Sequence, residues 1–188
     1  MTNEEARLYH NLALDTLDIP NVTKIGKVIW RHLSHYKSTV FTIGCGGSAA
    51  HAQHFAAELT GRFQQDRRGY PGQALTADGA TITAIANDYG WENVFKRQLE
   101  ALGKPGDMLV SFSTSGRSPA IVEAMSHARN TLQMTTLAII GDRESAAIGE
   151  AKHVIRAPSL DTAIIQELHT VIVHMLCRTI DDQHFQQK

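Results

Sequence analysis

The chain has 188 residues, of which 43% are hydrophobic and 20% are charged, and its formal net charge is −1. This composition excludes a disordered or fibrous chain, and the length suits one globular domain with a sizeable core. The near-zero charge argues against nucleic acid as a partner. The sequence has neither a secretory signal nor a run of about 20 apolar residues for a membrane helix. We therefore expect one cytoplasmic domain over residues 1–188 with no nucleic-acid or membrane partner.

The first 37 residues carry apolar side chains at helical spacing, and they predict two helices, over 3–17 and 22–36, outside the main sheet. From residue 38 to the end, short apolar runs alternate with amphipathic stretches. Strands are expected at 39–43, 72–75, 107–112, 135–140 and 153–156, and helices at 49–63, 119–129 and 162–180. Because parallel neighbours need long crossovers, this alternation predicts a three-layer, flavodoxin-like α/β domain. Its five-stranded parallel sheet would carry helices on both faces.

A glycine-rich turn over residues 44–48 follows the first of these strands and leads into a helix. Backbone amides in such a turn can approach an anion closely, and the helix dipole stabilises it there. The turn also fits the dinucleotide fingerprint, but the acidic residue expected at the end of the second strand is missing, since the first one is Asp78. A tight turn that needs glycine only for its backbone is the alternative.

A second loop carries four hydroxyls around one helix start, on Ser113, Thr114, Ser115 and Ser118. Pro119 is a favoured first helical residue, which makes Ser118 the predicted N-cap. Such a cluster, together with free amides, binds a phosphate without lysine. The alternative is an ordinary Ser/Thr-rich turn, but a cap needs only one hydroxyl.

A reactive helix face is predicted where His54, Glu58 and Arg62 follow one another at intervals of four residues. His54 and Glu58 together suit a divalent metal, and Glu58 alone suits a general base. An exposed helix with an ion pair is the other interpretation. Because the segment starts at the glycine turn, we expect the face to point toward the same site.

Two weaker candidates remain. His174 stands among apolar residues of the terminal helix, where a core histidine is the more common reading. Asn87 and Asp88 follow an apolar stretch, and a turn is the alternative to a binding role for this pair.

These separated segments together resemble one family, the sedoheptulose 7-phosphate (phosphoheptose) isomerases of the SIS (sugar isomerase) fold. The resemblance covers about residues 5–185 in the family's order and spacing. The matching segments are Gly46-Gly47-Ser48, residues 54–62, Ala86-Asn87-Asp88-Tyr89, residues 113–118, and residues 166–169 with His174.

The resemblance implies an aldose–ketose isomerase that converts sedoheptulose 7-phosphate to D-glycero-D-manno-heptose 7-phosphate through an enediol, for bacterial heptose and lipopolysaccharide biosynthesis. It implies that the sugar phosphate contacts Gly46, Gly47, Ser48, Glu58, Arg62, Asn87, Asp88, Ser113, Thr114, Ser115, Ser118 and Gln166. Zinc would be bound by His54, Glu58, Gln166 and His174, and Glu58 and His174 would be the acid/base pair. No nucleotide cofactor is implied.

The resemblance also implies a homotetramer with sites between subunits. Helix geometry supports shared sites, because Gln166 and His174 are separated by about 12 Å of helical rise, at the edge of reach for one metal.

Three positions depart from the family pattern: Cys45 replaces an asparagine, His51 replaces a small acidic residue, and Ile164 replaces a polar or basic one. Two other functions stay open. One is a non-catalytic SIS protein that binds the replication initiator, although such proteins tend to lose the helix glutamate that Glu58 retains. The other is an isomerase of a different sugar phosphate, which the change at Cys45 keeps open.

Overall fold

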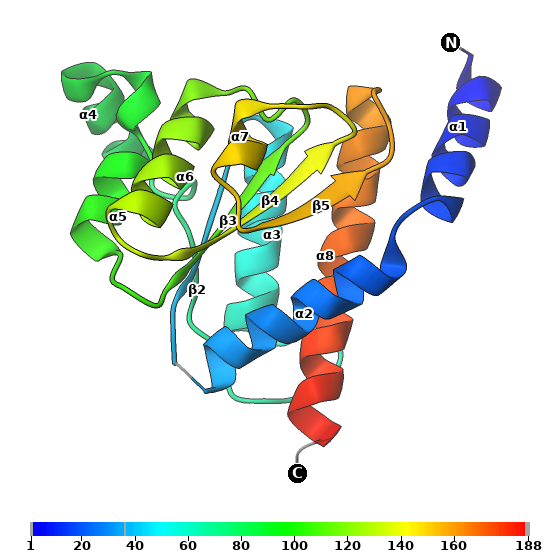
Figure 1. Cartoon of the computed structure of the whole chain (residues 1–188), viewed down its shortest axis with the longest axis horizontal. Helices are drawn as coiled ribbons and strands as arrows, with labels where there is room; N and C mark the ends of the chain where they lie inside the picture. Colours follow the sequence, from blue (N-terminus) through cyan, green and yellow to red (C-terminus); the bar gives the residue numbers. More distant parts are fainter. Residues whose placement is uncertain (1, 36, 187–188) are drawn as a thin grey trace.

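A computed structural model of the chain describes residues 2–35 and 37–186. The strands form one parallel sheet in the order β2-β1-β3-β4-β5 (Figure 1). They are β1 (Val40–Gly44), β2 (Gly72–Ala74), β3 (Met108–Ser113), β4 (Thr135–Gly141) and β5 (His153–Ala157). The predicted five-stranded parallel sheet is therefore confirmed.

Helices cover both faces of the sheet, which confirms the three-layer prediction. One face carries α1 (Asn3–Asp15), α2 (Ile19–Ser34), α3 (Gly47–Thr60) and α8 (Thr162–Gln186). The other carries α4 (Gly79–Tyr89), the 3-10 turn η1 (Trp91–Asn93), α5 (Lys96–Leu102), α6 (Pro119–Asn130) and α7 (Ala146–Gly149). Among the described residues, no helix is long and apolar enough to cross a membrane.

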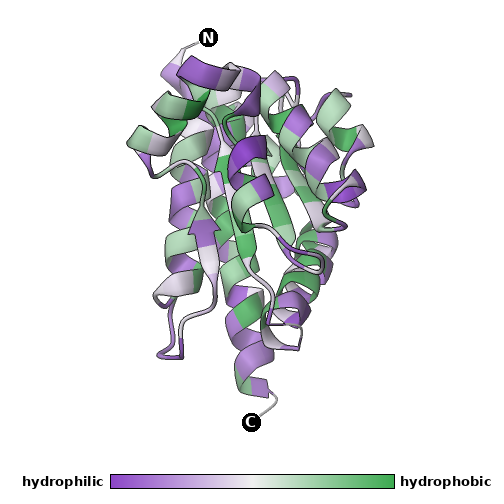
Figure 2. Cartoon of the chain, turned by 90° about the vertical axis from the view of Figure 1, so that its left-hand side faces the viewer, coloured by the Kyte–Doolittle hydropathy of each residue, from purple (hydrophilic) through white to green (hydrophobic). Residues whose placement is uncertain are grey.

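Two hydrophobic cores form because side chains alternate between the faces of each strand. Val40 and Val110 point into the core under α2, α3 and α8. Phe41 and Leu109, their neighbours along the strands, point into the core under α5 and α6. Figure 2 shows the hydrophobic residues on the central strands. The sheet is thus packed against helices on both faces. The loops at the carboxyl ends of its strands lead into helices on either face.

Several element boundaries differ from the sequence prediction. The second helix starts at Ile19 instead of residue 22, because Asp18 caps it and Pro20 fits its first turn. It ends at Ser34, and residue 36, where the prediction ended it, lies outside the described residues. The sequence analysis also did not assign α4, α5 and α7, and it ended α8 six residues too early.

Candidate functional site

The site begins at the junction of two neighbouring strands. β1 and β3 are paired along their length, but β1 leads into α3 on one face of the sheet and β3 leads into α6 on the other. Such a divergence opens a crevice at the carboxyl ends of the strands, where α/β proteins bind ligands. The two loops meet here, since Cys45 Sγ lies 3.6 Å from Ser118 Oγ. The structure thus brings the two predicted phosphate loops together.

Glycine is required in the first loop for more than one reason. Gly46 has φ 59°, and a Cβ on Gly44 would lie 2.3 Å from the Ser48 carbonyl oxygen. A Cβ on Gly47 would lie 2.6 Å from Gln166 Nε2. No side chain caps the start of α3, so the positive end of the helix dipole faces the loop. Gly44 and Gly46 are therefore needed for the tight turn, and Gly47 leaves room for the Gln166 side chain. These structural reasons for glycine are compatible with anion binding by the same loop.

The hydroxyls of the second loop are divided between internal bonds and the crevice. Ser113 Oγ is buried and accepts from the Gly116 amide at 2.9 Å, and Ser115 Oγ accepts from the Arg117 amide at 3.3 Å. Ser118 is the N-cap residue of α6, which confirms the prediction, but its side chain makes no capping hydrogen bond to the described residues. Its hydroxyl faces Cys45 instead. Thr114 and Ser118 are half-buried and remain within reach of a ligand.

Deeper along α3, three side chains cluster. Ligand atoms of His54, Glu58 and His174 all lie within 4.8 Å of one another. His54 Nε2 is 3.2 Å from Glu58 Oε1, and the His54 and His174 rings are 5.1 Å apart. All three are half-buried, so solutes can reach them. Two imidazoles and one carboxylate are the ligand set of catalytic zinc sites, which keep a fourth position open.

Helices α3 and α8 hold this cluster because they run side by side. Gln166 lies against Gly47, the Thr170 hydroxyl is 3.5 Å from His51 Nδ1, and His174 meets His54. Gln166 therefore lies at the glycine turn, about two helical turns from His174. The predicted four-ligand set is thus divided within one chain: three members form the cluster, and Gln166 lies at the glycine turn.

Other predicted site residues lie elsewhere. Arg62 does not share the helix face of His54 and Glu58, because α3 ends at Thr60; it is exposed. Asn87 and Asp88 are exposed at the end of α4, and Asn87 Nδ2 donates to Asp88 Oδ1 at 2.8 Å. They form part of a helix, not a turn, and α4 lies apart from α3 and α8 in Figure 1.

Ile164, the third departure from the family pattern, is buried in the core. Isoleucine therefore contributes to the core at this position, where the family pattern has a polar or basic residue.

Two residues near the site had no role in the sequence analysis. Phe63 stacks on the His174 ring at 5.7 Å, and nothing in the sequence indicated this contact. His169 is fully buried, edge-on to His51 and Phe112, and neither of its ring nitrogens has a hydrogen-bond partner among the residues that the structure describes. Burial, with a smaller contribution from His51, lowers the His169 pKa to about 3, so it is neutral. Burial also lowers the pKa of His51.

Comparison with known proteins agrees with this geometry. Residues 12–141 match the SIS domain model. The phosphoheptose isomerase 1 of Campylobacter jejuni is 44% identical over 161 residues, which is 86% of each chain. The phosphoheptose isomerase of a Bradyrhizobium species is 40% identical over 179 residues, covering 94% of this chain and 89% of that one. The chain belongs to the phosphoheptose isomerases, within the SIS-domain family.

Solved structures of phosphoheptose isomerases have the same fold. That of Francisella tularensis superposes with a TM-score of 0.87 at 35% identity, covering 95% of this chain and 94% of that one. That of Neisseria gonorrhoeae gives 0.83 at 35% identity, with coverage of 96% and 100%. The family match thus extends from the sequence to the whole α/β architecture.

Proposed function

We propose that the chain is an aldose–ketose isomerase that converts sedoheptulose 7-phosphate to D-glycero-D-manno-heptose 7-phosphate in the cytoplasm, for bacterial heptose biosynthesis. The observation that carries the proposal is the His54–Glu58–His174 cluster, placed along α3 from the meeting point of two anion-binding loops. His54 comes seven positions after Gly47, which is about 10 Å of helical rise. An open-chain sugar phosphate with its phosphate at the loops would therefore present its carbonyl end to the cluster.

The phosphate end would be held without lysine. The amides of Gly46 and Gly47, the start of α3, and the hydroxyls of Ser48, Thr114 and Ser118 supply donors. Asn87 and Asp88 would contact substrate only if another chain or a movement of α4 brought them to the site, because they are exposed on α4.

Isomerisation requires a proton to move between C1 and C2 of the open-chain sugar. Glu58 would remove the proton from one carbon, giving an enediol, and would return it to the other. His174 would move the compensating proton between the two oxygens, so that no atom is gained or lost. Phe63, stacked on His174, would fix the plane of that ring.

The donor set fits zinc: His54, Glu58 and His174 would hold it and leave a position open. When bound, the ion would polarise the substrate oxygens and stabilise negative charge that develops on them. Gln166 of the same chain lies at Gly47. A fourth ligand would therefore be Gln166 of a second copy or an oxygen of the substrate.

We also propose a homotetramer with shared sites. Helix α1 buries only Ala13 and leaves Leu8 and Leu12 exposed by 67% and 58%. Helix α4 has no buried residue at all. Isolated helices of this length are marginal in water, so apolar faces of this kind favour packing against another chain.

Two observations favour a second candidate, the isomerisation of a different sugar phosphate. Cys45 faces the crevice where the family has an asparagine, and His51 lies on the α3 face between Gly47 and His54. Cys45 and His51 would both change the side chains that contact the central carbons of a bound sugar phosphate. The non-catalytic reading, a protein that binds the replication initiator, is disfavoured because Glu58 is retained within a complete cluster.

Replacing Glu58 by glutamine tests the proposal. The change keeps the shape of the side chain and removes its basic oxygen, so kcat should fall by about 10²- to 10⁴-fold while substrate binding weakens much less. The assay follows a panel of ketose phosphates that includes sedoheptulose 7-phosphate, with the product identified.

Glu100→Gln, on the remote helix α5, is the matched control and should leave kcat unchanged. Because a carboxamide is a poorer metal ligand, metal content is measured on the same samples. Near-normal turnover in a folded, metal-replete Glu58→Gln protein would reject Glu58 as the base.

A further inference from the structure

A buried ion pair lies beyond the cluster and outside the mechanism above. Arg67 Nε donates to Asp181 Oδ1 at 2.9 Å, and the side chains are only 1% and 4% exposed. Asp181 Oδ2 also accepts from the amides of Gln64 and Gln65, at 3.3 and 3.4 Å. A buried pair costs desolvation and is weak evidence for stability on its own, which leaves open what this one does.

Other donors of Arg67 go to the end of α3, and Nη1 also donates to the Arg68 carbonyl at 3.4 Å. Nη2 donates to the Glu58 carbonyl at 2.9 Å and Nη1 to the Leu59 carbonyl at 3.0 Å. These carbonyls belong to the last turn of the helix, where a cation is favoured by the helix dipole. Arg67 therefore fixes the backbone of Glu58, whose side chain belongs to the cluster.

Asp181 connects Arg67, and through it the Glu58 turn of α3, to helix α8. It lies on α8 seven residues after His174, which is two turns along and on the same helix face. Between them lies Cys177, whose thiol pKa is raised by burial and then by the carboxylates of Glu58 and Asp181. Cys177 is itself buried, so the α8 face between His174 and Asp181 packs into the core.

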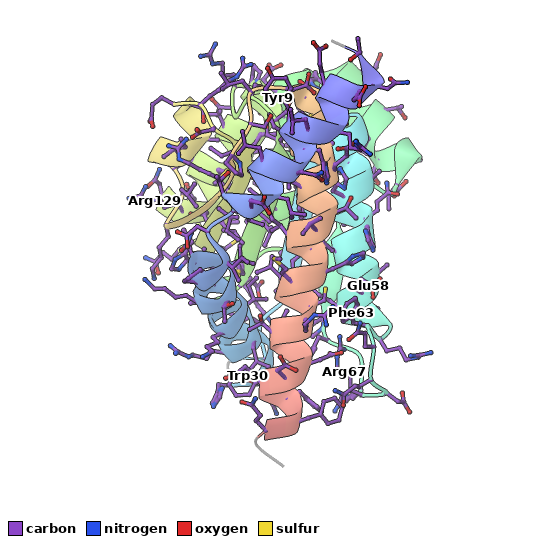
Figure 3. The ribbon with its side chains drawn as sticks, turned by 90° about the vertical axis from the view of Figure 1, so that its right-hand side faces the viewer. Tyr9, Trp30, Glu58, Phe63, Arg67 and Arg129 are labelled. Carbon is purple, nitrogen blue, oxygen red and sulfur yellow. The ribbon has the colours of Figure 1, made fainter. Side chains whose placement is uncertain are left out.

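The segment held by the pair also touches His174. Residues 61–71 join α3 to β2, and their backbone is bonded to Asp181 at Gln64 and Gln65. Phe63, one residue before, stacks on His174. In Figure 3, Glu58, Phe63 and Arg67 lie in this order toward the C-terminal end of α8.

We propose that Arg67 and Asp181 are positioning residues: they clamp the Glu58 turn of α3 to α8 and hold Phe63 against His174, and so set the geometry of the His54–Glu58–His174 cluster. For catalysis the proposal rests on the proposed isomerase function, but cluster geometry can be measured without it. Cobalt(II), added alone, is the probe, because its absorption reports ligand geometry and its titration gives an affinity.

The first variant is Asp181→Asn, which keeps the side-chain shape but removes the charge. Loss of an outer partner of a metal site typically costs 10- to 100-fold, so we expect cobalt(II) affinity and kcat to fall by about that range, with KM changed much less. Asp181→Glu restores the carboxylate and should recover part of both losses.

Leu99→Ala is the matched control for stability, because it truncates a buried residue of α5 in the other core. At a comparable loss of Tm, it should leave cobalt(II) affinity and kcat unchanged. Equal losses in Leu99→Ala and Asp181→Asn would assign the effect to stability and overturn the proposal. A folded Asp181→Asn with cobalt(II) affinity and spectrum like the parent would overturn it too.

Two further variants keep the test decisive if Asp181→Asn does not fold. Arg67→Met with Asp181→Leu replaces the pair by apolar side chains, an exchange that buried pairs often tolerate. Phe63→Leu removes the ring stack and leaves the pair intact. Both should weaken cobalt(II) binding, and parental binding in both would reject the clamp. If the parent protein isomerised no sugar phosphate while these cobalt(II) effects held, the proposed function would fail and the positioning role would stand.

Discussion

His169 shows how a single residue near the site can govern the response of the whole protein to pH. It is fully buried between His51 and Phe112, and neither ring nitrogen makes a hydrogen bond within the described part of the chain. The charged form is therefore strongly disfavoured, and the pKa is lowered to about 3. The unfolded chain, in contrast, binds a proton on this histidine near its ordinary pKa of about 6.5.

Below about pH 6.5 the unfolded state therefore binds more protons than the folded one, and stability falls as pH falls toward 3. Between pH 7 and pH 5, His169 alone should cost about 2 kcal/mol of unfolding free energy. His169→Phe removes this contribution. Urea unfolding at both pH values, with a chelator present, should show a smaller loss in the variant than in the parent. Parallel losses in the two proteins would show that His169 takes up no proton on unfolding.

Sequence reasoning found the reactive residues but not all of their neighbours. The spacing of four residues correctly predicted that His54 and Glu58 share a helix face, since both lie within α3. The prediction that Arg62 shares this face was wrong, because the helix ends at Thr60 and Gly61 follows it. The Phe63–His174 contact joins residues 111 positions apart, and only the tertiary packing of α3 and α8 creates it.

At the level of elements, β1, β3 and β4 were predictable because each is a short, largely apolar run, and β1 and β4 end at glycine. Helices α5 and α7 are short, with seven and four residues, and helical periodicity is hard to detect over such lengths. Helix α4 buries no residue, so its apolar side chains carry little of the inward-facing pattern that sequence analysis detects. The predicted separation of Gln166 from His174 followed from helical rise alone, and the structure bears it out.

The crossing of α2 and α8 depends on one glycine. A Cβ on Gly26 would lie 2.7 Å from Thr179 Cβ, whereas a Cβ on Gly79, the first residue of α4, meets nothing within 4 Å. Gly26→Ala should therefore destabilise by about 1–3 kcal/mol through crowding, offset by about 1 kcal/mol of helix propensity.

Gly79→Ala makes the same chemical change without crowding and should be neutral or slightly stabilising. Tm measured at one protein concentration separates the two variants, because assembly makes Tm depend on concentration. Equal shifts of Tm in the same direction for Gly26→Ala and Gly79→Ala would mean that α2 and α8 can move apart at Gly26 without loss of stability.

The whole molecule combines a well-packed α/β core with poorly covered helices at its edges. The sheet and its two cores place both loops and the cluster. Helix α1 is tied to α8 through the His10 Nδ1–Glu167 Oε2 contact of 2.6 Å but buries little. Two features were inferred from the family resemblance and not from the residues: the fourth metal ligand and the subunit arrangement. Both would require another chain.

Assembly gives the last prediction. If the exposed faces pack between copies, the mass in solution should be four times 20.7 kDa, or about 83 kDa. Leu8→Glu with Leu12→Glu places two charges on the apolar face of α1, and burying unpaired charges is costly, so the mass should fall. Sedimentation equilibrium measures this directly.

Ile19→Glu is the control, since Ile19 is also an exposed apolar residue but lies on α2, outside the α1 and α4 faces that are proposed to pack between copies. It should keep the parental mass. If sites are shared, activity should fall together with mass in the α1 variant and not in the control. A parent that is a monomer with full activity would rule out shared sites, and the cluster of three ligands in one chain would then have to suffice without Gln166 of a second copy.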